Sequence, residues 1–364
     1  MIWRGRFIPS GWRSVNREIR ARWSLLGLGA ALCIALVMSI GTGPMAIGMS
    51  QSLHALLAGF GVMAGETIPA HIAAIVEAIR LPRALLAMLV GAALAVSGAA
   101  LQGLFRNPLA DPGLIGVSGG ASLAAVAVIV LGDTVLIGLS DLLGAYTLPL
   151  AAFAGALCTT LIVARIATSR FGTSMTALLL AGLAIGIVTG AGTGLLTFMA
   201  NDDQLRALTF WSMGSLGGAT WDRVIAAGAL ILLALSLMPF VIKALNALLL
   251  GESEARHLGI DVERAKRWVI TLSALAVGAS VAVSGMIGFV GLIVPHIVRL
   301  SLGPDHRYLL PASALLGALF LLVADMFSRT VIAPAELPIG LLTTLIGGPV
   351  FIGLIVMRAK RSAL

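Results

Sequence analysis

Long apolar stretches alternate with short polar ones along most of the chain. Stretches of about 20 apolar residues are long enough for an α-helix to cross the hydrocarbon core of a membrane. The pattern predicts an all-α polytopic membrane protein with ten transmembrane helices. We expect these helices at 25–48, 84–105, 114–137, 146–167, 174–199, 222–246, 268–286, 289–302, 308–330 and 338–357.

The eighth of these spans is short and contains Pro295, so it is not expected to cross as a regular full-length helix. A further short helix is predicted near 204–217, in the loop after the fifth span.

The composition agrees with a membrane protein. Hydrophobic residues make up 59% of the chain and charged residues 11%, and the 43 glycines suit close helix packing in lipid. The net charge of +8 does not indicate a nucleic-acid partner, because the basic residues are distributed by loop and form no single patch. Cys33 and Cys158 lie in apolar runs, which favours neither a disulfide framework nor a metal site.

The chain begins with a basic arm at 1–24, followed by an apolar run too long for a signal peptide. We interpret this run as a retained first span of a membrane domain at 25–358, with a tail at 359–364. All but five of the 24 lysines and arginines fall on the side of the two termini. Positive charge stays cytoplasmic, so both termini are expected to face the cytoplasm.

One cytoplasmic loop, at 251–268, is unusually polar. Eight of its eighteen residues are charged, in a chain that is otherwise lipid-soluble. A compact polar element between two spans is a place where a soluble partner could bind.

Several common enzyme motifs, including the nucleotide-binding P-loop, are missing. The three lysines do not follow a glycine, which excludes a P-loop, and the sequence contains no zinc-protease or C-x-x-C motif. Transport would therefore need an ion gradient or a motor on a partner. Asp325 is the best candidate for a gradient-driven relay, but an ion pair with Arg329 near the membrane surface explains both residues.

Three long segments, at 80–120, 284–318 and 324–358, resemble the ABC importer permeases for iron chelates, haem and cobalamin, the FecCD-type family. The resemblance implies a type II ABC importer permease fold in the bacterial inner membrane. It also implies a homodimer in membrane lipid, two cytoplasmic ATP-binding subunits and a periplasmic substrate-binding protein. ATP and Mg would be used by the ATPase subunits, and this chain would bind no cofactor or metal of its own.

The resemblance also implies which residues contact the ATPase. The segment 251–268 would form two short coupling helices, with a glycine at the turn and apolar anchors beside it. The implied residues are Glu252, Glu254, Arg256, Leu258, Gly259 and Ile260.

Three arginines on the other side of the membrane match family positions that meet carboxylates of the binding protein. They are Arg80, Arg83 and Arg329. Bidentate pairing with carboxylates would orient the partner as well as attract it. The alternative is that they anchor helix ends in the membrane interface.

The fifth span carries a glycine at every fourth position, at Gly182, Gly186, Gly190 and Gly194. Such a face permits close approach of another helix or of a flat ligand. In the resembling family this span and the tenth line the central path, so the face either borders that path or packs within its own bundle. The resemblance places a cytoplasmic gate in the preceding loop, at Ser169, Phe171, Thr173 and Ser174. Transport is expected to proceed by alternating access.

The stretch 208–221, with Trp211 and Trp221, is more similar to haem permeases than to the others. We therefore expect haem as substrate, with a ferric siderophore or cobalamin as the alternative and an ion-gradient-driven carrier as the more remote one.

Overall fold

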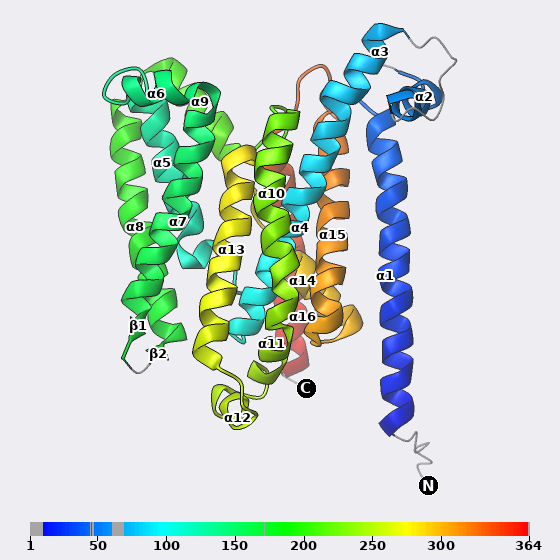
Figure 1. The fold of residues 1–364 in the computed structure, drawn as a ribbon, viewed down its shortest axis with the longest axis vertical. Helices are drawn as coiled ribbons and strands as arrows, with labels where there is room; N and C mark the ends of the chain where they lie inside the picture. Colours follow the sequence, from blue (N-terminus) through cyan, green and yellow to red (C-terminus); the bar gives the residue numbers. More distant parts are fainter. Residues whose placement is uncertain (1–9, 44, 46, 60–68, 171, 363–364) are drawn as a thin grey trace.

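The computed structural model describes residues 10–43, 45, 47–59, 69–170 and 172–362. These residues form a bundle of helices with one small two-stranded hairpin (Figure 1). The longer helices are α1 (Ser10–Gly41), α4 (Leu81–Leu104), α5 (Val117–Leu131), α7 (Thr147–Ala167), α8 (Met175–Met199), α10 (Trp221–Leu237), α13 (Val262–Ser284), α14 (Val290–Leu302), α15 (His306–Ser328) and α16 (Ile339–Ser362). The shorter elements are α2 (Met49–Gly59), α3 (Ala70–Ile75), α6 (Ile137–Leu143), α9 (Asp202–Met213), α11 (Ile242–Leu248), α12 (Glu252–His257), β1 (Thr168–Ser169) and β2 (Gly172–Thr173).

The apolar helices correspond to the ten predicted spans. Within the described residues, seven helical stretches are long and apolar enough to cross a membrane, and three shorter apolar helices accompany them. The shorter ones are α5, α14 and the apolar part of α16. The extra helix predicted near 204–217 is α9. It begins with a capping box formed by Asn201 and Gln204.

The prediction for α14 is confirmed. The helix α14 has 13 residues and contains Pro295, so it extends about 20 Å at about 1.5 Å per residue. That is shorter than the hydrocarbon core of about 30 Å.

The first helix differs from the prediction at both ends. It begins at Ser10, so the second half of the expected basic arm is helical, and it ends at Gly41 rather than near 48. Arg20 in this extension donates a hydrogen bond to the carbonyl of Ser301. A helix can continue beyond the membrane where its side chains become polar, which hydropathy alone does not indicate.

The helix α4 forms the centre of the bundle, with α13, α14 and α15 packed around it (Figure 1). Glycines permit the closest contacts: a Cβ on Gly91 would lie 2.2 Å from the carbonyl oxygen of Gly317, and one on Gly98 would lie 1.8 Å from that of Gly291. In lipid, helices associate by close packing rather than by the hydrophobic effect, so these contacts position α4 against its neighbours.

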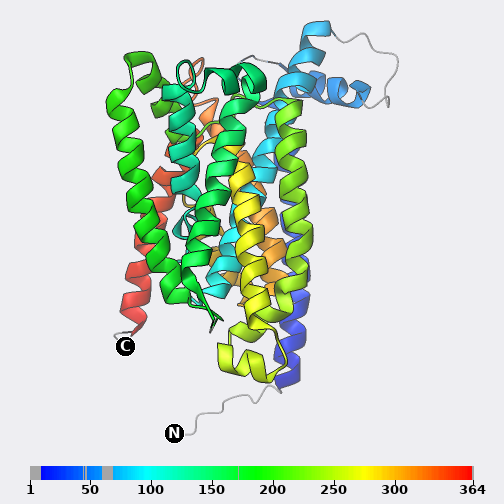
Figure 2. The same ribbon diagram turned by 60° about the vertical axis from the view of Figure 1, so that its left-hand side comes forward.

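The bundle has two different ends. One end carries both termini, α12 and the β1–β2 hairpin, and we call it the terminal end (Figures 1 and 2). The opposite end carries α2, α3, α6 and α9. The turned view places α8 and α16 on the same side of the molecule (Figure 2).

Candidate functional site

The polar segment 251–268 begins with a short, sharply terminated helix. Gly251 precedes α12 with φ +129°, and Gly259 follows it with φ +78°. The N–H of Ile260 donates to the carbonyl of Ala255 at 3.0 Å, and that of Gly259 donates to Arg256 at 2.9 Å. These two bonds form a Schellman motif, which favours glycine at the left-handed position. The predicted turn at Gly259 is confirmed.

The second half of the segment was expected to form a separate short helix, but the structure shows that it is the start of a long one. Asp261 caps α13 by accepting a hydrogen bond from the N–H of Arg264 at 2.9 Å, and α13 then continues to Ser284. The cap and the apolar run that follows propagate one helix directly into the bundle. Any force on this part of the segment is therefore applied to a membrane helix.

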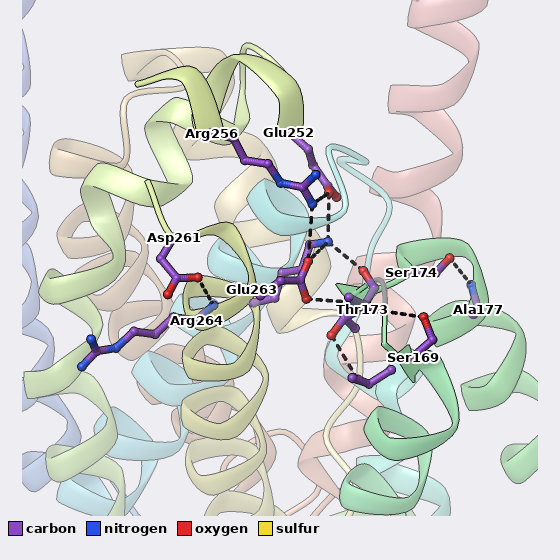
Figure 3. A network of polar contacts seen from close by, with 12 residues as sticks. Ser169, Thr173, Ser174, Ala177, Glu252, Arg256, Asp261, Glu263 and Arg264 are labelled. Carbon is purple, nitrogen blue, oxygen red and sulfur yellow. Dashed lines mark hydrogen bonds and ion pairs between the residues drawn. The ribbon is translucent and has the colours of Figure 1, made fainter. Parts of the chain in front are cut away.

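A buried lysine connects α12 with α13. The Lys266 side chain is 2% exposed, and its Nζ lies 3.0 Å from carboxylate oxygens of both Glu252 and Glu263. Arg256 lies farther from the same two carboxylates, at 3.6 and 3.7 Å (Figure 3). The two carboxylates compensate the charge of the Lys266 ammonium, which would otherwise be costly to bury.

The same lysine also reaches the hairpin. Its Nζ donates to the carbonyl oxygen of Thr173 at 2.7 Å, and the N–H of Thr173 donates to Glu263 at 2.7 Å (Figure 3). The backbone of one residue in β2 is therefore held by two neighbouring side chains of α13.

The hairpin is small and closed by its own contacts. Thr168 pairs with Thr173, and their hydroxyl oxygens lie 3.0 Å apart. Ser169 pairs with Gly172, and Ser174 caps α8 by accepting from the N–H of Ala177. The predicted gate residue Phe171 lies outside the described residues.

We call Glu252, Arg256, Glu263, Lys266 and Thr173 the hinge network. It joins the predicted coupling segment to the predicted gate loop, which the sequence presented as two separate sites. Sequence reasoning missed Lys266 and Glu263, since charged residues near a helix start usually face solvent. Of the remaining predicted coupling residues, Glu254 and Leu258 are exposed, whereas Ile260 is partly buried against the hydrophobic core.

At the opposite end, two of the predicted docking arginines bind groups at the end of α1 and in the segment that follows it. Arg80 donates to the carbonyls of Ile40 and Met45 at 2.8 and 2.7 Å, and Arg329 donates to the carbonyl and hydroxyl of Ser39. The last carbonyls of a helix have no partner within it, and they attract cations. Both guanidinium groups are nearly fully buried.

The third arginine belongs to a carboxylate cluster. Arg83 lies 2.9 Å from Asp325 and 2.8 Å from Glu336, and Arg329 lies 3.3 Å from Asp325. The predicted Asp325–Arg329 ion pair is confirmed, and it lies buried within the bundle rather than exposed on its surface. Both side chains are buried, because Arg83 and the carbonyls of α1 supply partners inside the bundle. All three of the predicted docking arginines are therefore buried in this structure.

The glycine repeat of α8 is divided between packing and open space. A Cβ on Gly182 would lie 1.8 Å from the carbonyl oxygen of Leu114, so this position packs within the bundle. Cβ atoms on Gly186, Gly190 and Gly194 would meet no atom within 4 Å. Three of the four positions therefore leave an open strip on α8.

The aromatic stretch before α10 is positioned by backbone contacts. The indole N–H of Trp221 donates to the carbonyl of Glu77 at 2.9 Å, and the N–H of Gly214 donates to the carbonyl of Trp211. Both tryptophans lie towards the opposite end, at the ends of α9 and α10.

Residues 31–358 match the FecCD transport family. The chain is 51% identical over 286 residues to the hemin transport system permease protein of Yersinia pestis, covering 78% of this chain and 84% of the relative. It is 44% identical over 295 residues to a cobalamin import system permease protein of Halobacterium salinarum, covering 81% and 77%. It is 41% identical over 345 residues to the vitamin B12 import system permease protein of Salmonella typhimurium, covering 93% and 96%.

A solved structure described as an inward-facing metal-chelate type ABC transporter has a TM-score of 0.77 to this chain. It is 34% identical, and the match covers 92% of this chain and 98% of the other. The predicted fold, an all-α polytopic membrane permease, is confirmed by this match and by the apolar helices. From the family match and these relatives, the chain belongs to the FecCD transport family.

Proposed function

We propose that this chain is the membrane subunit of an ATP-driven importer that moves haem into the cytoplasm by alternating access. The observation that supports haem is the 51% identity to a hemin permease. Identities of 44% and 41% to cobalamin and vitamin B12 permeases make cobalamin the main alternative. A ferric siderophore remains a second alternative, because a metal-chelate transporter shares the fold.

The proposed orientation puts the terminal end in the cytoplasm of a bacterial cell, with the inner membrane around the bundle. The basic loops support this orientation, since all but five lysines and arginines belong to the side of the termini. In this orientation α12 and the hairpin face the cytoplasm.

The proposed motor is a pair of cytoplasmic ATP-binding subunits, each contacting α12 of one copy in a homodimer. Exposed Glu254, Arg256 and Leu258 offer mixed charge with an apolar anchor, a combination that gives a specific register. ATP and Mg belong to those subunits.

The hinge network supports a route from the motor to the gate. Displacement of α12 would pull on Glu252, and Lys266 would pass the displacement to α13 and to the backbone of Thr173. Because Nζ contacts all three elements within 3.0 Å, the segment and the hairpin would move together. This rigid connection is suited to tilting two halves of a homodimer about a central path, with the open glycine strip of α8 at its border.

Binding of a periplasmic substrate-binding protein is proposed at the opposite end. Glu336 is 35% exposed and holds Arg83, so a partner carboxylate could replace it on that guanidinium. Arg80 and Arg329 would keep their contacts with α1 and so hold the end of that helix in place beside the docking surface.

Uptake into proteoliposomes tests this proposal. The chain is reconstituted with its genomic partner ATPase and binding protein, and haem, cobalamin and a ferric siderophore are offered at fixed ATP. ATP-dependent accumulation of haem alone is expected. Accumulation of cobalamin or siderophore without haem would overturn the substrate, and uptake without the ATPase would overturn the importer.

A further inference from the structure

An open groove runs between α7 and α13, in the half of the bundle nearest the terminal end. It has a volume of about 820 Å³. Half of its twelve lining residues are apolar, and the other half are two arginines and four threonines: Leu157, Thr160, Leu161, Ala164, Arg165, Thr168, Thr173, Arg267, Ile270, Thr271, Ala274 and Leu275.

The groove is polar at one end and apolar along its length. The helix α7 runs towards the hairpin and α13 runs away from it, so Arg165 and Arg267 occupy the same level near the terminal end. Leu157 and Leu275 occupy the other end, eight residues away on each helix. Eight residues of helix correspond to about 12 Å, which is most of the depth of one leaflet, about 15 Å.

The surroundings of the groove are those of a lipid-facing surface. Leu161 and Ile166 on α7 are 63% and 61% exposed, and Trp268 on α13 is 43% exposed. Tryptophan beside arginine is typical of the level where the hydrocarbon meets the headgroups. This pairing favours headgroup depth for the two arginines, with the apolar lining below them.

The positive charge at one end of the groove indicates which kind of ligand it binds. Arg165 and Arg267 are both exposed, and neither makes an ion pair within the part of the chain that the structure describes. Two guanidinium groups at one level offer paired donors to a phosphate. An apolar groove below them would hold an acyl chain, whereas a soluble anion would leave it empty.

We propose that the α7–α13 groove binds one anionic glycerophospholipid of the leaflet at the terminal end. Its phosphate would lie between Arg165 and Arg267, and one acyl chain would follow the groove towards Leu157. Thr168 and Thr173 also line the groove, so the headgroup would lie beside the hairpin. Only the identity of the leaflet rests on the proposed function.

Native mass spectrometry of the purified full-length permease tests this site. The protein is titrated with phosphatidylglycerol and with phosphatidylcholine of identical acyl chains. Each of Arg165→Gln and Arg267→Gln should weaken phosphatidylglycerol binding about fivefold, since each basic residue near a lipid surface contributes about 1 kcal/mol. The double variant should lose about 25-fold, and phosphatidylcholine should bind weakly throughout.

Arg264→Gln is the matched control, because Arg264 is exposed on the same turn of α13 but lines a different pocket. It should leave the lipid preference unchanged. Ala164→Trp would fill the groove and should remove both lipids, which distinguishes a seated lipid from general attraction to positive charge. Equal binding of the two lipids, or an unchanged preference in the double variant, would overturn the proposal. The assay contains neither substrate nor ATPase, so its result is separate from that of the uptake experiment.

Discussion

Lys266 donates a 2.7 Å hydrogen bond to the carbonyl oxygen of Thr173, which lies 93 residues earlier in the chain. The contact joins a membrane helix to a hairpin at the same end of the bundle. Because the same ammonium also binds Glu252 and Glu263, one side chain holds three elements. Removal of the Lys266 charge should therefore weaken the contacts between α12, α13 and the hairpin.

Lys266→Met should lower the free energy of unfolding by about 2 kcal/mol. Breaking a buried ion pair costs about 3–5 kcal/mol, and the partial exposure of both carboxylates reduces this loss. Denaturant titration of the purified permease measures the change. Arg256→Gln is the control, because its longer contacts involve a guanidinium that is 56% exposed and should contribute less than about 1 kcal/mol. Equal effects of the two variants would show that Lys266 is not the central contact.

Glu252 and Glu263 should have separable roles in the hinge network. Glu263 accepts from both Lys266 and the N–H of Thr173, whereas Glu252 makes no hydrogen bond to the hairpin within the described part of the chain. Glu263→Gln should therefore loosen the hairpin more than Glu252→Gln does.

Maleimide labelling of Ser169→Cys measures hairpin opening, in a background where the exposed Cys33 and Cys158 are replaced by serine. Labelling should be several times faster with Glu263→Gln than with Glu252→Gln. The same rate in both would mean that the hairpin is held by its own pairing alone.

Charge reversal in α12 should distinguish motor binding from internal support. Glu254 is exposed and outside the hinge network, while Glu252 is half-buried and inside it. Glu254→Lys should reduce co-purification of the ATPase without changing thermal stability. Glu252→Lys should reduce both, because it places a second cation beside Lys266. Unchanged co-purification in both variants would locate the ATPase contact elsewhere.

The Asp325 cluster should matter for stability rather than for ion coupling. Asp325 is completely buried between Arg83 and Arg329, so Asp325→Asn leaves two buried cations poorly compensated and should cost about 3–5 kcal/mol. Glu336→Gln should cost less, because Glu336 reaches the surface. Denaturant titration compares the two. A stable Asp325→Asn protein with abolished uptake would instead favour a proton relay.

The sequence predicted the membrane helices well because hydropathy records burial in lipid directly. Pro295 similarly marked the short α14. The polar contacts were predicted less well, since they depend on which backbone groups come close in space. Arg80 is buried because the end of α1 presents free carbonyls beside it. Lys266 is buried because Thr173 and two carboxylates surround it, and no local pattern indicates that encounter.

The glycine repeat of α8 allows a final test of the transport path. Gly182→Ala should destabilise the fold by about 1–3 kcal/mol, because its Cβ would collide with the backbone of Leu114. Gly190→Ala should instead be neutral or stabilising by up to about 1 kcal/mol, since it adds helix propensity in open space. Denaturant titration compares the two variants.

The larger variant Gly190→Phe should fold normally and block ATP-dependent uptake, because its ring would project from the open strip into the proposed path. Val188→Phe is the control: Val188 is 64% exposed and lies about 200° around the helix from Gly190, so uptake should persist. If Val188→Phe blocks uptake and Gly190→Phe does not, the path borders the other exposed face of α8. The glycines would then serve contact with lipid or with a second copy.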